Sequence, residues 1–253
     1  MDDYKSFAAL IYVTDTEEEA VLRMFDWKEK TFDNDSQLYR IADFEKNGMQ
    51  IIAARQDEMG MTASATLTMK LIEHFRPKYV IMPGIAAGAM DEADEEQMYG
   101  DVVLADMVWN YSNGKYVSKD KASIVFGEIG FLPRPTVVNV DKELLGYFEK
   151  AVKSVKNETH VHVGAMASGS TVVANKMILN QQVKSQFVST KGLEMEGYGV
   201  AYAASRATKP QPKAIIAKSV CDFADSRKSD MYQKFAAYTS CEFVKLLIED
   251  ILE

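Results

Sequence analysis

Two short stretches near the end of the sequence carry acids in positions suited to chemistry. In the stretch Gly-Leu-Glu-Met-Glu-Gly at 192–197, Glu194 and Glu196 flank one methionine at the start of a predicted helix rich in small residues. In the second stretch, Asp222 directly follows a strongly apolar predicted strand. Ligands of open α/β sheets bind at the carboxyl ends of strands, so these acids are placed to meet a substrate.

These acids could do different work. A carboxylate accepts two hydrogen bonds and suits the vicinal hydroxyls of a ribose, whereas a salt bridge or a solvated helix start would be a purely structural use. Positions i and i+2 do not share a helix face, so we expect Glu194 and Glu196 to have separate roles. Asp222 could be a general acid if burial favoured its protonated form. Alternatively, it could cap the next helix, although Asp225 fits the capping role better.

A third acidic group, Glu17 to Glu19, follows the first predicted strand. We expect Thr16 to cap the helix there, with Glu19 at the third helical position of a capping box. Acids at a helix start are often only solvated, because they favour the helix dipole. Here they follow a buried strand, which is where the sites of α/β proteins concentrate.

Small residues follow another predicted strand, in the segment Gly-Ile-Ala-Ala-Gly at 84–88. Such residues let backbone amides approach an anion or a sugar closely, although a tight strand-to-helix turn would use them as well. The segment lacks the Lys and Ser/Thr of a P-loop and the glycine spacing of a dinucleotide fingerprint. The segment is therefore a candidate binding loop, but it matches neither of these two nucleotide-binding motifs.

Strand and helix signals alternate along the chain. Apolar runs predict strands at 6–13, 49–54, 79–82, 101–108, 160–166 and 213–220. Helical spacing predicts helices at 62–75, 142–155, 192–204 and 231–252. Polar segments predict an acidic loop at 91–97 and a long loop at 110–135. We expect one domain over residues 1–253, a three-layer α/β/α sandwich with a central mixed, mostly parallel sheet.

Bulk properties exclude several classes. The 29 basic and 37 acidic side chains give a formal charge of −8, which disfavours binding to a nucleic-acid polymer. Two cysteines are too few for a disulfide scaffold, so a reducing cytoplasm is expected. No signal peptide and no run of about 20 apolar residues is visible, so no membrane association is expected. The three histidines lack metal-ligand spacing, and we expect no metal and no cofactor.

Taken in order, these segments resemble the purine nucleoside phosphorylase and nucleosidase superfamily. The resemblance is closest to the methylthioadenosine/S-adenosylhomocysteine nucleosidases and to the nucleosidase domains of bacterial defence and fungal immune-type proteins. It covers nearly the whole chain and rests on the segments 16–19, 83–88, 99–106, 167–170, 193–196 and 221–225. The segments 108–115 and 221–228 suggest the defence-type branch, some of whose members hydrolyse adenine nucleotides, including ATP.

The resemblance implies cleavage of a purine N-glycosidic bond. It implies that Asp222 protonates N7 of the leaving base, that Glu196 binds the ribose hydroxyls, and that Glu19 orients or activates water with Glu194 near it. It also implies a homo-oligomer, either a dimer or a hexamer. The further substrate-binding residues that it implies are Met195 on the sugar face, Val172 and Val173 at the base, Ile85, Ala86, Ala87 and Gly88 in the small-residue loop, and Lys218 where nucleosidases often carry Arg.

The expected nucleophile follows from a difference between this chain and the phosphorylases of the superfamily. Phosphorylases of this superfamily carry a Gly-Asp-Pro-x-Arg phosphate loop after the first strand, whereas this chain has the acidic, Arg-free segment Val-Thr-Asp-Thr-Glu at 13–17. Phosphate would be repelled there, so water is the expected nucleophile. A phosphate-dependent phosphorylase and an inactive nucleoside-sensing module are the alternatives. Loop cations could bind a 5′-phosphate or could simply be solvated, namely Lys115, Lys119, Lys121, Arg134, Arg227 and Lys228.

Overall fold

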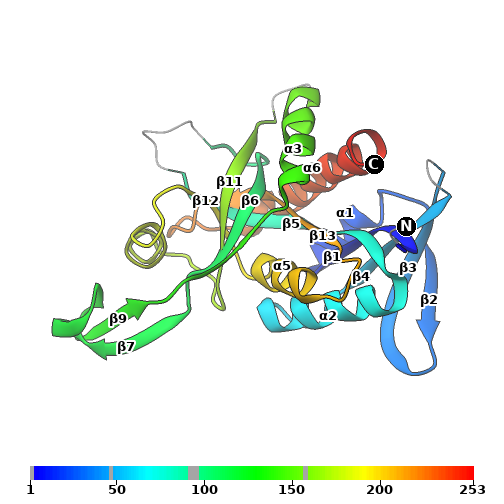
Figure 1. Cartoon of the computed structure of the whole chain (residues 1–253). Helices are drawn as coiled ribbons and strands as arrows, with labels where there is room; N and C mark the ends of the chain where they lie inside the picture. Colours follow the sequence, from blue (N-terminus) through cyan, green and yellow to red (C-terminus); the bar gives the residue numbers. More distant parts are fainter. Residues whose placement is uncertain (1–2, 46–47, 91–96, 156–158) are drawn as a thin grey trace.

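The computed structural model describes residues 3–45, 48–90, 97–155 and 159–253, so the acidic loop expected at 91–97 lies almost wholly outside it. In these ranges ten strands form one mixed sheet and three more form a small separate sheet (Figure 1). The strands are β1 (Ser6–Tyr12), β2 (Lys28–Phe32), β3 (Asp35–Phe44), β4 (Met49–Arg55), β5 (Pro77–Gly88), β6 (Val102–Asn110), β7 (Gly114–Ser118), β8 (Ile124–Phe126), β9 (Ile129–Pro133), β10 (Thr136–Asn139), β11 (Val161–Ser168), β12 (Thr190–Glu194) and β13 (Lys213–Asp222).

Helices separate most of these strands. The α-helices are α1 (Asp15–Val21), α2 (Met61–Phe75), α3 (Lys142–Ser154), α4 (Lys176–Ile178), α5 (Gly197–Arg206) and α6 (Gln233–Leu246). Short turns of other helix types are η1 (Lys119–Lys121), η2 (Leu179–Lys184), η3 (Asp230–Tyr232) and η4 (Leu247–Ile251). Within the described ranges, we find no helix with the length and apolar character required to cross a membrane.

The large sheet runs in the order β10-β6-β11-β12-β5-β1-β4-β3-β2, and β13 pairs with both β5 and β6. Parallel ladders join β1 to β4 and β5, β13 to β5, and β11 to β6 and β12. Antiparallel ladders bring in β2, β3 and β10 at the ends and also join β12 to β5 and β13 to β6. The expected mixed α/β sheet is confirmed.

Helices cover both faces of the sheet, with α2 and α5 on one side and α1, α3 and α6 on the other (Figure 1). Successive residues of β1 alternate between the two layers. Leu10 and Tyr12 pack with residues of α1, α3 and α6, and Ala9 and Ile11 pack with residues of α2 and α5. Because both faces are covered, the strand reads as a continuous apolar run. The expected three-layer sandwich is confirmed.

Two expectations about local structure are wrong, and one hairpin was not expected. The segment 110–135 is not a plain loop, since β7, β8 and β9 form an antiparallel sheet that stands out from the body of the molecule (Figure 1). Its strands are five, three and five residues long, so the apolar runs at 124–126 and 129–133 are too short to stand out among the polar residues around them. The hairpin of β2 and β3 is not predicted either, because the first four residues of β2 are exposed and polar. The helix expected from 192 is instead strand β12 up to Glu194, with α5 starting at Gly197.

Helices α2 and α5 approach closely at Gly199. A Cβ on Gly199 would lie 2.2 Å from the carbonyl oxygen of Met61 and 2.3 Å from Ser64 Oγ. Ser64 Oγ in turn donates to the carbonyl oxygen of Glu196 at 3.0 Å, and the backbone N–H of Gly60 donates to Glu196 Oε1 at 2.8 Å. This contact between helices therefore fixes the position of Glu196.

Replacing Gly199 with Ala should force α2 and α5 apart. Overpacking of this kind costs about 1–3 kcal/mol, which urea unfolding would detect as a lower free energy of unfolding. The matched control is Gly146→Ala on α3, where a Cβ meets no atom within 4 Å. There the better helix propensity of Ala should stabilise the protein by about 0.8–1 kcal/mol. Equal effects of the two substitutions would contradict the role of this contact.

Candidate active site

A cavity of about 290 Å³ lies at the carboxyl ends of β1, β5, β12 and β13. Its volume is near the lower limit of ordinary small-molecule sites. Segments far apart in the sequence meet here because the parallel strands end at one edge of the sheet. The expected site residues on its wall are Ile85, Ala86, Ala87, Val172, Val173, Glu194, Met195, Glu196 and Asp222.

Glu19 does not reach the cavity. Its side chain is 54% exposed, and its carboxylate pairs with Lys234 of α6 at 3.0 Å. The helix begins two residues earlier than expected, because Thr14 rather than Thr16 is the N-cap and Glu17 completes the capping box. The sequence holds two overlapping box patterns, and the one adjacent to the buried strand is the one that forms. The expectation that Glu19 faces the substrate is therefore wrong, and Glu17 takes that place on the cavity wall.

Glu17 is buried and held by four donors. The backbone N–H groups of Val13 and Thr14 donate to Oε2 at 3.0 and 3.1 Å, and that of Ile85 donates to Oε1 at 3.0 Å. Lys218 Nζ lies 3.3 Å from Oε1. Burial alone would raise the pKa of Glu17, but the Lys218 charge and these hydrogen bonds outweigh it and hold the pKa below its usual value. Glu17 is therefore an anion at neutral pH.

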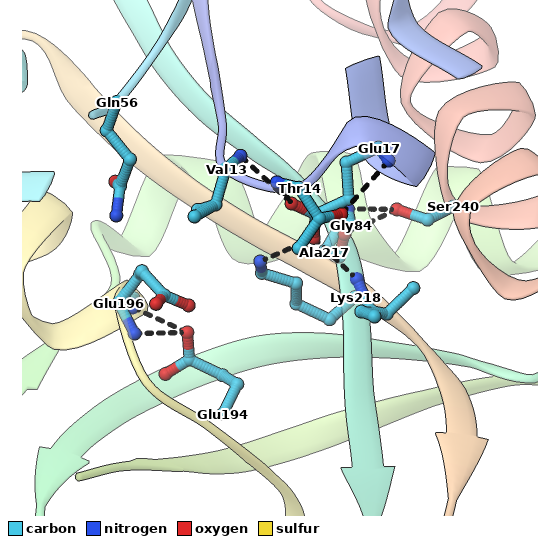
Figure 2. Close-up of polar contacts among 12 residues, drawn as sticks. Val13, Thr14, Glu17, Gln56, Gly84, Glu194, Glu196, Ala217, Lys218 and Ser240 are labelled. Carbon is cyan, nitrogen blue, oxygen red and sulfur yellow. Dashed lines mark hydrogen bonds and ion pairs between the residues drawn. The ribbon is translucent and has the colours of Figure 1, made fainter. Parts of the chain in front are cut away.

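Lys218 lies behind the wall rather than on it, with a side chain that is 1% exposed. Figure 2 shows it reaching from β13 to Glu17, with Glu194 and Glu196 on the facing segment. Burial would lower the pKa of Lys218, yet the charges of Glu17, Glu196 and Glu194 raise it above its usual value. The expected substrate-binding lysine is thus a buried counter-ion for carboxylates.

Gly84 makes room for this ion pair. It adopts a φ of 141°, and a Cβ there would lie 1.9 Å from Glu17 Oε1 and 2.8 Å from Lys218 Nζ. Its N–H donates to Ser240 Oγ of α6 at 2.8 Å, and Ser240 Oγ donates to the carbonyl oxygen of Ala217 at 2.7 Å. Ser240 thereby joins β5 and β13 at the level of the ion pair (Figure 2).

Glu194 and Glu196 differ as their spacing suggests. Glu194 Oε2 accepts the N–H groups of Glu196 at 2.8 Å and Gly197 at 2.7 Å, and Oε1 accepts from the Ser168 hydroxyl. It therefore holds the first residues of α5 in place. Burial and the neighbouring carboxylates raise the pKa of Glu196 to about 7, despite the opposing effects of Lys218 and the Gly60 N–H.

Asp222 is buried at the end of β13. Its Oδ1 accepts the Ala224 N–H at 2.8 Å, and its Oδ2 accepts from the Lys228 ammonium and from Cys221 Sγ at 3.5 Å. Burial and the Asp222 charge raise the pKa of the Cys221 thiol to about 12, so it stays protonated. Asp225 does not cap a helix as expected, since its Oδ1 accepts the Arg227 N–H in a tight turn.

Other expected residues lie off the cavity wall. Gly88 pairs with Gly192 between β5 and β12, and the candidate phosphate-binding cations Lys115, Lys119, Lys121 and Arg134 belong to the small sheet or its flanks. The lining residues that were not expected as site residues include Glu17, Met59, Thr171, Asp230 and Gln233. Among the described residues, no group of three or more His, Cys, Asp or Glu side chains is arranged to hold a metal ion.

Comparison with known protein families shows to which family the chain belongs. The family model described as "Phosphorylase superfamily" matches residues 8–253. The chain belongs to the phosphorylase superfamily. The crystal structure of 5′-methylthioadenosine/S-adenosylhomocysteine nucleosidase from Neisseria meningitidis, in complex with methylthio-immucillin-A, has the same fold. The two structures superpose with a TM-score of 0.76, and their sequences are 20% identical. The match covers 96% of this chain and 99% of that chain.

Two curated relatives are longer than this chain. A protein of Sinorhizobium fredii named "uncharacterized protein y4jS" is 30% identical over 239 residues, which are 90% of this chain and 56% of that protein. The ATP nucleosidase Cap17 of Escherichia coli strain KTE188 is 28% identical over 204 residues, which are 74% of this chain and 39% of that protein. The chain thus spans little more than half of the first superfamily relative and less than half of the second.

Breaking the buried ion pair should make stability depend on pH in a defined direction. In Lys218→Met the buried Glu17 loses its cation, which should lower the free energy of unfolding by about 3–5 kcal/mol near neutral pH. In the native protein the lowered Glu17 pKa adds stability that is lost as the pH falls. In the variant burial should raise that pKa, so stability is lost as the pH rises.

The difference between the two proteins should therefore widen from about pH 5 to about pH 8, as measured by urea unfolding across that range. Lys234→Met is the control, because its ion pair with Glu19 is exposed and its loss should change stability little. A loss in Lys218→Met that is the same at every pH would contradict the assignment of charge to Glu17.

Proposed function

We propose that this member of the phosphorylase superfamily hydrolyses the N-glycosidic bond of a purine nucleoside or nucleotide, with adenine as the base and water as the nucleophile. One observation carries the proposal. The buried carboxylate of Glu17 lies against the turn after β1. Of the residues that the structure describes, five carboxylates and one lysine line the same cavity. An inorganic phosphate would meet repulsion there, whereas a neutral water would be bound and polarised.

Carboxylates suit the transition state of this reaction. As the bond between C1′ and N9 breaks, positive charge develops on the ribose ring. Fixed negative charges close to the ring stabilise that charge, and they need no reorganisation when they are already held by hydrogen bonds. We assign Glu196 to the ribose hydroxyls, since only one of its oxygens is engaged by the Gly60 N–H. Glu194 supports it by fixing the chain at the start of α5.

We assign the attacking water to Glu17. Glu17 lies on the cavity wall, and its Oε1 accepts one backbone N–H, that of Ile85, besides its contact with Lys218, so this oxygen has capacity left for a water in the cavity. The carboxylate is anionic and can accept the proton that the water loses on attack. Lys218 favours the ionised form of Glu17 and is not itself exposed to the cavity.

We assign the base to the part of the cavity wall that Val172, Val173 and Asp222 form. Val173 is buried and Val172 is 57% exposed on that wall, so both offer apolar surface to a purine ring. Asp222 and Lys228 add polar groups to the same wall. Protonation of the departing base is typically worth about 10²–10⁴-fold in rate, and we assign that role to the Asp222 carboxyl group at the end of β13.

The names of relatives support adenine as the base. One relative is named an ATP nucleosidase, and one structural neighbour is named a methylthioadenosine/S-adenosylhomocysteine nucleosidase. Both names describe compounds that contain adenosine, and they differ in what the 5′ carbon carries. We therefore include both nucleosides and 5′-nucleotides in the proposed substrate class.

Product analysis over a substrate panel tests the proposal. The purified chain is incubated with adenosine, methylthioadenosine, AMP and ATP in phosphate-free buffer, and released base is measured by liquid chromatography. Free adenine should appear from at least one of them without added phosphate. Release that requires phosphate would favour a phosphorylase, and tight binding without any release would favour a sensing module. Either result would overturn the proposal.

Paired substitutions distinguish the inward glutamate of α1, Glu17, from the outward one, Glu19. Glu17→Gln should lower kcat by at least about 10²-fold, because the amide cannot accept the proton from water. Glu19→Gln should leave kcat unchanged, since that side chain pairs with Lys234 outside the cavity. Urea unfolding of both variants separates loss of chemistry from loss of fold. The opposite ranking of the two variants would contradict the assignment of water to Glu17.

A further inference from the structure

Arg55, the last residue of β4, lies beside the turn that precedes α1 and Glu17. The parallel ladder between β1 and β4 places it next to the end of β1. Its guanidinium group donates from Nε to the carbonyl oxygen of Val13 at 2.8 Å. The same group pairs through Nη1 with Asp15 at 2.7 Å and with Glu18 at 2.9 Å. Arg55 is therefore bound both to the turn and to the start of α1.

The carbonyl group that Arg55 holds belongs to a peptide unit that also contacts Glu17. The Val13 carbonyl and the Thr14 N–H are the two ends of one planar peptide unit. That N–H donates to Glu17 Oε2 at 3.1 Å (Figure 2). A hydrogen bond at the carbonyl end fixes the plane of the unit and strengthens the bond that its N–H makes, because hydrogen bonds in a chain polarise one another. A single peptide unit therefore links Arg55 to Glu17.

The shape of the guanidinium group suits this link. The group is planar, its N–H groups point in fixed directions, and it stays charged throughout the ordinary pH range. Asp15 and Glu18 hold it at Nη1, so its Nε is directed at the Val13 carbonyl. A lysine here would keep the charge but would lack a rigid fork to bond a carbonyl and two carboxylates at fixed angles.

Glu18 is itself held from its other side by Arg40 of β3. Arg40 Nη2 lies 2.9 Å from Glu18 Oε1, and Arg40 Nη1 donates to Tyr12 Oη at 2.7 Å. The described contacts of Arg40 thus join it to the same ion cluster but not to the peptide unit that Arg55 holds. The two arginines share a carboxylate and differ in the contact that leads to Glu17, so they form a matched pair for experiment.

We propose that Arg55 is a positioning residue for the attack of water, which fixes the peptide unit before α1 and thereby holds the Glu17 carboxylate in the orientation that takes the proton from water. This inference rests on the proposed function, since it concerns the base of that same reaction. Arg55 is not among the described residues that line the cavity, so it acts on the reaction through Glu17.

The link has a defined sign for the pKa of Glu17. The Thr14 N–H is one of the groups that hold this pKa below its usual value, so loosening the peptide unit raises it. Because Glu17 must be an anion to accept a proton, a raised pKa removes activity on the acid side of the pH profile. The other titratable groups around Glu17 are Lys218 and Cys221 on β13, Glu194 and Glu196 on the facing segment, Cys241 on α6, and Asp15 and Glu18 on α1. A substitution of Arg55 leaves all of them in the protein.

Kinetics of Arg55 variants across a range of pH test the proposal, with a substrate of the panel that releases adenine. Arg55→Met should lower kcat by about 10–10²-fold with a smaller change in KM, because Glu17 contacts water rather than the nucleoside. The acid limb of its kcat/KM profile should move up by about half a pH unit, which is about threefold in rate at a fixed pH on that limb. Arg55→Lys should stay impaired, because it restores the charge without the rigid fork. Arg40→Met, which loses the same partner Glu18, should keep the native kcat and pH profile.

A double variant shows whether Arg55 acts through Glu17. Where Glu17→Gln has already removed the base, adding Arg55→Met should lower kcat no further. A purely structural role of Arg55 would lower kcat by the same factor in both backgrounds. Urea unfolding at the assay pH ensures that folded proteins are compared, and Arg55→Lys replaces Arg55→Met in the double variant if Arg55→Met does not fold.

Each outcome has a defined meaning. Loss of rate with an upward shift of the acid limb in the Arg55 variants, with neither in Arg40→Met and no loss added to Glu17→Gln, supports the proposal. Native kcat in a folded Arg55 variant, loss of rate without the shift, an equal loss in Arg40→Met, or an equal factor in the Glu17→Gln background overturns it. Absence of base release from the unmodified chain would instead be a failure of the proposed function, which the substrate panel detects separately.

Discussion

The site depends on one buried ion pair, that of Glu17 with Lys218. Both side chains are almost completely removed from solvent, at 2% and 1% exposure. Transferring two charges from water costs several kcal/mol per ion, and only close pairing with further hydrogen bonds offsets that cost. Three backbone N–H groups provide those bonds for Glu17. The turn after β1 and the strand β5 must therefore keep their positions for the pair to exist.

Much of the surrounding fold can be understood from this requirement. Gly84 lets β5 approach the carboxylate, where any side chain would collide with Glu17. Ser240 of α6 bonds to both β5 and β13, the strands that carry Ile85 and Lys218. The charge of Lys218 also acts on Glu194 and Glu196 across the cavity. One buried cation is thus shared by Glu17 and by the two carboxylates of the facing segment.

Elements that are buried can be predicted from the sequence, because burial requires apolar residue types. The strands at 6–12 and 213–222 are mostly apolar, and the acids at 194, 196 and 222 lie at or just after strand ends that meet. The small sheet of β7, β8 and β9 gives a weaker signal, because its apolar runs at 124–126 and 129–133 are short and lie among polar residues. Glu17 and Glu19 are equivalent in composition, and only the capping geometry at Thr14 shows which of them turns inward. The contact of Lys228 with Asp222 depends on the path of a loop, which residue types do not specify.

The central claim is that water, not phosphate, attacks C1′ in this acidic cavity. The most direct measurement runs the reaction in ¹⁸O-labelled water with inorganic phosphate present and weighs the sugar product by mass spectrometry. If water attacks, the released sugar carries one ¹⁸O at C1′ and no sugar 1-phosphate forms. A sugar product with a 1-phosphate would contradict it.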